Sequence, residues 1–228
     1  GVGPQDVALA LIKETFACGF VKNRVLEFVG KGIKGLSMDF RNGIDVMTTE
    51  TTCLSSIWET DEKTEEYYAA HGRESAYKKL SPEEDTYYDR GIVIDLSKVE
   101  PMIALPFHPS NAYTIRDFLS RPYELLKKCE EAGQKLLPAG KGEFKLTDKI
   151  RDGKVYVEQG VIAGCAGGMY ENIAAATEIL ADAPVKNNDF TLDIYPSSQP
   201  VYKALAENGY SDTVVKALTN KEYPGWGY

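Results

Sequence analysis

The chain has 228 residues, 43% of them hydrophobic and 26% charged, and its 26 basic and 34 acidic residues give a net charge of −8. This composition is typical of a soluble globular protein with material for one large domain or two smaller ones. The acidic balance argues against a sequence-independent basic surface, so we expect no nucleic-acid partner. No apolar stretch approaches the roughly 20 residues of a membrane span and no secretory signal pattern is visible, so we expect a cytoplasmic protein with no membrane partner.

The first part of the chain mixes helical and extended patterns. Its predicted elements, in order, are a helix over 3–18, a strand over 25–29, a glycine-rich loop over 31–42, a helix over 44–58 and a helix from Thr60 to about residue 71. The helix over 44–58 rests on apolar residues at three- and four-residue steps, and the next helix on Thr60 as N-cap before an acidic turn. A strand over 92–96 follows, and three prolines argue against regular structure over 101–111.

The second part has the strand–helix order of an α/β fold. Its predicted elements are a helix over 114–132 interrupted near Pro122, an exposed linker over 133–153, strands over 155–162 and 190–195, and helices over 169–181, 198–208 and 211–219. Strands that alternate with helices of about 10–15 residues favour a parallel sheet with right-handed crossovers. We therefore predict an α/β fold of parallel-sheet strand–helix units, divided into residues 1–105 and 106–228.

The cysteines do not suggest a disulfide framework. Four of them are scattered without C-x-x-C spacing, at Cys18, Cys53, Cys129 and Cys165. In a long, apolar-rich chain this pattern is typical of reduced thiols, and we expect the first three to be buried small residues. Two histidines, His71 and His108, are too few for a histidine-based metal cage.

Cys165 differs because it stands in a glycine-rich turn, Gly164-Cys165-Ala-Gly-Gly168, between a predicted strand and a predicted helix. Ligands collect outside the carboxyl ends of parallel strands, where N–H groups at the helix start favour anions and thiolates. Cys165 could therefore be a metal ligand, a nucleophile or a buried small residue. The glycines match neither G-x-G-x-x-G nor the P-loop, which disfavours a phosphate site.

Several strings, taken in order along the chain, resemble the aconitase family. Gly3-Pro4-Gln5-Asp6-Val7 is similar to the Gly-Pro-Lys-Asp-Val start of that family's second domain, and Glu50 stands where the family has a Glu before Gly-Ala-Thr-Thr-Ser. The string around Cys165, followed by Met-Tyr-Glu-Asn, resembles the family's Gly-Ser-Cys-Thr-Asn turn and Tyr-Glu-Asp helix. Two further strings resemble the family's proline-rich crossover and its Pro-Gly-Ser turn, over residues 94–101 and 190–199. The nearest variant is the aconitase-like hydratase branch, which has Gly-Cys-Ala-Gly-Gly.

The resemblance implies an iron–sulfur hydro-lyase of four domains. In this family a 4Fe–4S cluster with three cysteine ligands has one open iron, a Lewis acid that acts on a hydroxy di- or tricarboxylate. The resemblance implies that residues 1–105 and 106–228 have the α/β folds of the second domain and the front of the third. It further implies that Cys165 is one cluster ligand, that Glu50 is a catalytic residue lining the substrate cavity, and that the remaining domains of the polypeptide are partners.

Two departures from the family pattern bear on what this chain does alone. No C-x-x-C occurs in the 63 residues after Cys165 (166–228), so the two other expected ligands are absent. One thiolate cannot hold a 4Fe–4S cluster, so we expect a fragment that is inactive and iron-free by itself. Val46 replaces an asparagine that in the family hydrogen-bonds near the cluster, which argues against the usual citrate chemistry.

Simpler interpretations remain open for each residue. Glu50 could be a solvated surface carboxylate, and His108, between Phe107 and Pro109, is interpreted as structural rather than catalytic. A different class of function is a non-catalytic anion-binding α/β module whose glycine turn holds a carboxylate or phosphate. Calorimetry against citrate, isopropylmalate and phosphate would separate this module from an inert fragment.

Overall fold

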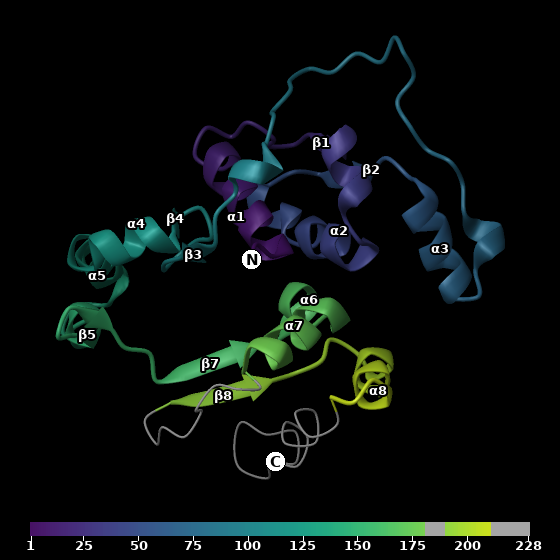
Figure 1. Ribbon diagram of the computed structural model, residues 1–228. Helices are drawn as coiled ribbons and strands as arrows, with labels where there is room; N and C mark the ends of the chain where they lie inside the picture. Colours follow the sequence, from purple (N-terminus) through teal and green to yellow (C-terminus); the bar gives the residue numbers. More distant parts are fainter. Residues whose placement is uncertain (181–189, 211–228) are drawn as a thin grey trace. The chain divides into compact units, whose positions relative to one another are not determined.

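The computed structural model describes residues 1–180 and 190–210 (Figure 1). The chain forms two compact units, Gly1–Ile115 (unit 1) and Arg116–Tyr228 (unit 2). The predicted domain boundary, between residues 105 and 106, falls inside unit 1. The predicted helix over 211–219 lies outside the described residues. No helix in the described ranges is long and apolar enough to cross a membrane.

Unit 1 is built around α1 (Pro4–Thr15), which buries an apolar face that includes Val7, Leu11 and Ile12. Proline is well tolerated in the first turn of a helix, because a backbone N–H at that position would have no acceptor within the helix. The Asp6 carboxylate accepts a hydrogen bond from the Gly3 N–H at 2.7 Å. Burial of large aliphatic side chains, worth about 1.5–3 kcal/mol each, makes α1 the centre of this unit's core.

The loop predicted over 31–42 is wrong, because a short 3-10 helix and an α-helix form there. These are η1 (Lys31–Gly35) and α2 (Met38–Asp45). The Ser37 hydroxyl accepts a hydrogen bond from the Phe40 N–H at 3.0 Å and caps α2. A serine N-cap of this kind stabilises a helix by about 1 kcal/mol, which offsets the low helix propensity of the glycine-rich sequence.

The helix predicted over 44–58 is also wrong beyond Asp45. The chain instead forms η2 (Thr48–Thr51) and β2 (Ser55–Trp58), and β2 pairs in parallel with β1 (Val25–Phe28). The hydroxyls of Thr48 and Thr51 donate to backbone carbonyls of the preceding turn, and Thr52 has a left-handed φ of 65°. Threonine side chains that bond locally compete with a regular helix, so periodicity alone misled the prediction here.

A buried arginine fixes the next helix, α3 (Glu62–Ala70), to α2 and η1. The N-cap is Asp61 rather than the predicted Thr60, whose hydroxyl instead bonds to the backbone of Leu80. The fully buried Arg41 guanidinium donates to Asp61 Oδ2 and to the Ile33 carbonyl. Burial alone would raise the pKa of Asp61, but the hydrogen bond and charge of Arg41 hold it below its ordinary value. Asp61, whose carboxylate is paired with the Arg41 guanidinium, is therefore the N-cap of α3 in preference to the neutral Thr60.

Most of the segment from Tyr77 to Asp95 (the 77–95 segment) is irregular and exposed, following η3 (Glu74–Ala76) and preceding η4 (Leu96–Lys98). The strand predicted over 92–96 is wrong. Val93 is 94% exposed, and residues 92–95 pair with no strand among the described residues. An apolar run becomes a strand only where a neighbouring strand accepts its hydrogen bonds.

A hairpin follows, made of β3 (Met102–Ala104) and β4 (Ala112–Thr114) in antiparallel register. The expectation of no regular structure over 101–111 is therefore wrong at β3. Pro101 precedes that strand, while Pro106 and Pro109 lie in the loop, so none of the three removes a ladder N–H.

Unit 2 begins within α4 (Ile115–Ser120), at its second residue, and α5 (Pro122–Leu136) follows, which confirms the predicted interruption of a helix near Pro122. The exposed linker expected over 133–153 instead starts inside α5 and contains η5 (Thr147–Lys149) and β5 (Ile150–Arg151), which forms a hairpin with β6 (Lys154–Val155) just beyond it. The single strand predicted over 155–162 is wrong at residues 156–158, which separate β6 from β7 (Gln159–Ile162). The buried Glu130 carboxylate accepts hydrogen bonds from Leu146 N–H, Thr147 N–H and the Thr147 hydroxyl at 2.6–2.9 Å. This contact fixes the segment onto α5, which its composition did not reveal.

The rest of unit 2 is a strand–helix unit. β7 (Gln159–Ile162) and β8 (Thr191–Ile194) are parallel, and they lie side by side in Figure 1. Between and after them come α6 (Gly164–Gly167), α7 (Tyr170–Leu180) and α8 (Gln199–Glu207). Ile173, Ile194 and Leu205 form the core shared by β8, α7 and α8. The predicted α/β class is confirmed.

Candidate functional site

The first candidate site is the turn that carries Cys165, at the carboxyl end of β7. Cys165 lies in the single-turn helix α6, and it is exposed. Gly164 begins the turn with a φ of +81°, a backbone conformation that residues other than glycine rarely adopt. The structure therefore places the thiol at the strand–helix junction where ligands of α/β proteins collect, as predicted.

A second turn, after β8, supports the Cys165 turn. The Tyr195 N–H donates to the Ile162 carbonyl and the Ser197 N–H to the Gly168 carbonyl, both at 2.8 Å. Gly168 permits this approach: a Cβ there would lie 2.7 Å from the carbonyl oxygens of Gly164 and Tyr195. The backbone around Cys165 is thus fixed by direct contact with the turn after β8.

Among the residues described, Cys165 has no companions with which it could form a metal site. Over 1–180 and 190–210, no three or more His, Cys, Asp or Glu side chains come together as a metal site. The other cysteines follow the prediction only in part. Cys129 is buried, Cys53 is half-buried, and Cys18 is exposed, because it follows the end of α1, where its thiol donates to the Glu14 and Thr15 carbonyls.

The second candidate site is Glu50, in unit 1. It lies on η2 rather than on the long helix predicted, and its carboxylate is about half exposed. Glu50 Oε2 lies 3.9 Å from His108 Nε2, which is within ion-pair distance and beyond direct hydrogen-bond distance. Val46, the C-cap of α2, carries no side-chain hydrogen-bonding group. The structure thus brings Glu50 together with a histidine that the sequence suggested was structural.

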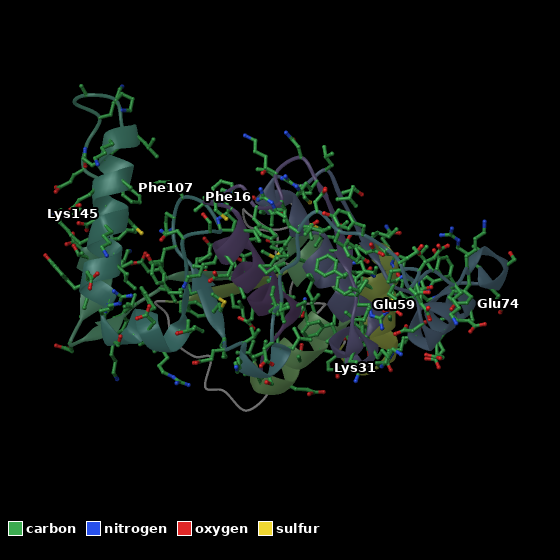
Figure 2. All side chains as sticks on the ribbon, turned by 90° about the horizontal axis from the view of Figure 1, so that it is seen from above. Phe16, Lys31, Glu59, Glu74, Phe107 and Lys145 are labelled. Carbon is green, nitrogen blue, oxygen red and sulfur yellow. The ribbon has the colours of Figure 1, made fainter. Side chains whose placement is uncertain are left out.

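His108 is held by contacts on two sides. Its ring stacks on Phe16, with centroids 3.8 Å apart, and its Nδ1 accepts a hydrogen bond from the Ser110 N–H at 3.1 Å. Figure 2 shows Phe16 beside the loop that carries Phe107 and His108. No spacing rule relates Glu50 to His108, so the sequence offered no signal for this pair.

Comparisons with known proteins show the family to which this chain is similar. The model of the aconitase family (aconitate hydratase) matches residues 1–225. The large subunit of 3-isopropylmalate dehydratase from Caldicellulosiruptor bescii is 31% identical over 192 residues, covering 84% of this chain and 37% of that protein. The same subunit from Elusimicrobium minutum is 30% identical over 227 residues, covering 100% of this chain and 46% of that protein. The one from Acetivibrio thermocellus is 30% identical over 216 residues, covering 95% and 43%.

The chain spans less than half the length of these curated relatives. The family match nevertheless extends over both units and includes Glu50 and Cys165. This chain belongs to the aconitase family.

Proposed function

We propose that this chain is part of a hydro-lyase that depends on a 4Fe–4S cluster and catalyses the dehydration and rehydration of a hydroxy di- or tricarboxylate. The observation that carries the proposal is Cys165, an exposed thiol on a backbone fixed at the carboxyl end of a parallel strand pair, in a chain of the aconitase family. Unit 1 would correspond to the family's second domain and unit 2 to the front of its third.

In this proposal Cys165 supplies one of three thiolate ligands. A cluster of this type, when bound, supplies an open iron that acts as a Lewis acid on the substrate hydroxyl. The other two cysteines would come from the part of the polypeptide that the relatives have in addition. The four cysteines, none of them in a disulfide, favour a reducing compartment, the cytoplasm.

Glu50 would line the substrate cavity. A half-exposed carboxylate can accept a hydrogen bond from a substrate hydroxyl or from the water that leaves and returns. Val46 offers an apolar side chain where the family has an asparagine, and the curated relatives are named 3-isopropylmalate dehydratase. We therefore place an isopropylmalate-type hydroxy acid ahead of citrate as substrate.

The test uses the complete polypeptide that contains this chain, reconstituted anaerobically with iron and sulfide. Cluster absorbance and dehydration of 3-isopropylmalate and citrate are measured for the wild type, Cys165→Ser and the matched exposed control Cys18→Ser. We expect Cys18→Ser to behave as wild type and Cys165→Ser to lose both cluster and activity.

The same reconstitution of the 228-residue chain alone should give no stoichiometric cluster. A Cys165→Ser protein that keeps the full cluster would refute the ligand assignment. A stoichiometric cluster on the 228-residue chain would instead refute the expectation that this chain cannot hold one.

A further inference from the structure

Two segments that are far apart in sequence meet at the C-terminal end of α1. η2, which carries Glu50, packs against α1, and so does the β3–β4 hairpin. The hairpin is fixed to the helix by a hydrogen bond from the Met102 N–H to Asp6 Oδ1 at 2.6 Å, and Lys13 Nζ lies over the Tyr113 ring. One rigid helix therefore places both Glu50 and the hairpin loop.

The hairpin loop, residues 105–111, is fixed by its own hydrogen bonds. The Leu105 N–H donates to the Asn111 carbonyl at 2.8 Å, and the Asn111 N–H donates to the His108 carbonyl at 2.9 Å. The Asn111 amide also donates to the Pro106 carbonyl at 2.7 Å, and the Leu105 side chain is buried. The backbone of His108 is held on both sides as a result.

These contacts also decide which edge of the His108 ring faces Glu50. Nδ1 faces two groups of Ser110: the backbone N–H at 3.1 Å, which can only donate, and the hydroxyl at 3.0 Å, which can donate or accept. We infer that Nδ1 is the acceptor, because this tautomer satisfies the N–H while the hydroxyl can still turn to donate. In the neutral ring the proton is then on Nε2, the atom 3.9 Å from Glu50 Oε2. Stacking on Phe16 keeps the ring plane in this orientation.

We propose that His108 is a positioning residue for Glu50: its Nε2 edge, fixed by Phe16 and Ser110, lies 3.9 Å from the Glu50 carboxylate, and a small turn of that half-exposed side chain brings the two into a hydrogen bond that restricts the carboxylate to one orientation. A half-exposed glutamate otherwise samples several rotamers, and catalysis requires a carboxylate held in one geometry. The catalytic part of this inference rests on the proposed role of Glu50. The His108–Glu50 pairing itself does not.

The pairing is tested by NMR on the 228-residue chain, using side-chain nitrogen resonances. The chain has two histidines, so His71, whose ring lies against Tyr67, is an internal reference. We expect neutral His108 to have a protonated Nε2 and an acceptor Nδ1, and Glu50→Gln to shift the His108 ring resonances while those of His71 stay in place. A proton on Nδ1, or His108 resonances that do not respond to Glu50→Gln, would overturn the proposal.

The catalytic consequence is tested in the complete polypeptide. We expect His108→Ala to lower kcat by about 10- to 100-fold with little change in KM, His108→Gln to restore part of the loss through its amide N–H, and His71→Gln to have no effect. In a Glu50→Gln background, His108→Ala should cause no further loss, because the residue acts through Glu50. A further, additive loss would contradict the positioning role.

The two proposals fail separately. A wild-type polypeptide that holds a cluster and dehydrates neither acid would refute the proposed function, while the NMR result still decides the pairing. An active enzyme whose His108 ignores Glu50→Gln would refute this inference alone.

Discussion

Replacing Gly168 by alanine tests whether the Cys165 turn is held in place by the turn after β8. The added Cβ would lie 2.7 Å from two carbonyl oxygens and 2.9 Å from the Ser197 nitrogen, all of them backbone atoms that cannot rotate away. Separating the turns would also lose the Ser197–Gly168 hydrogen bond. Overpacking costs about 1–3 kcal/mol and the lost bond about 1 kcal/mol, so the expected destabilisation of unit 2 is about 2–4 kcal/mol.

The sign of this effect is informative. Gly168 has a φ of −86°, which alanine adopts freely. Without the close contacts, alanine would stabilise the protein by about 0.4–1 kcal/mol, because it restricts the unfolded chain. The structure therefore predicts that Gly168→Ala destabilises the protein, whereas backbone entropy alone would predict that it stabilises it.

Urea unfolding of the 228-residue chain, with amide exchange at Ser197 and Ile173 to report on unit 2, measures the change. Gly160→Ala is the matched control: its Cβ would meet the ends of the Leu192 and Phe190 side chains, which can move, so we expect a loss within about 1 kcal/mol. A Gly168→Ala protein as stable as wild type, with unchanged exchange at Ser197, would show that the two turns are not in the contact described.

Two further predictions concern other parts of the chain. Glu130→Gln should lower the free energy of unfolding by about 2 kcal/mol near neutral pH, because the buried carboxylate loses charge-assisted hydrogen bonds from Leu146 and Thr147. The Thr147 hydroxyl, the two N–H groups and Lys127 lower the pKa of Glu130. The difference in free energy of unfolding between wild type and Glu130→Gln should therefore narrow as pH falls below about 4.3, the pKa of an unfolded glutamate. Urea unfolding at several pH values, with Glu131→Gln as control, measures this difference, and a difference that does not change with pH would contradict the prediction. Brief chymotrypsin digestion followed by mass spectrometry should cut unit 1 first within the 77–95 segment, at Tyr87, which is 89% exposed; first cleavage in α1 would argue against the exposed course of this segment.

The sequence predicted best where local chemistry and packing agree. Pro122 interrupts α4 and α5 as expected, because proline is tolerated in a first turn and not in a helix interior. The β7–α7–β8 order follows from apolar residues of each element that pack in the observed core, among them Ile162, Ile173 and Ile194. The position of Cys165 was predictable for the same reason, since it depends on one strand, one turn and one helix that are consecutive in the chain.

The failures arise where distant groups decide the structure. The apolar spacing over 44–58 suits a helix, yet pairing with β1 draws Ser55–Trp58 into a strand. Thr60 loses the N-cap to Asp61 because buried Arg41, on another helix, stabilises the aspartate. Glu50 and His108 come together only through the packing of η2 and the hairpin on α1. None of these partners is visible in a local window of sequence.

The two oxygens of Asp6 have a consequence for the distant Glu50–His108 pair. Oδ2 caps the first turn of α1, while Oδ1 anchors the first residue of β3, so a single carboxylate sets the register between helix and hairpin. That register in turn sets how far along α1 the hairpin loop reaches, and so whether the histidine ring meets Phe16. A change at the start of the helix can therefore alter the separation of two side chains at its far end without touching either of them.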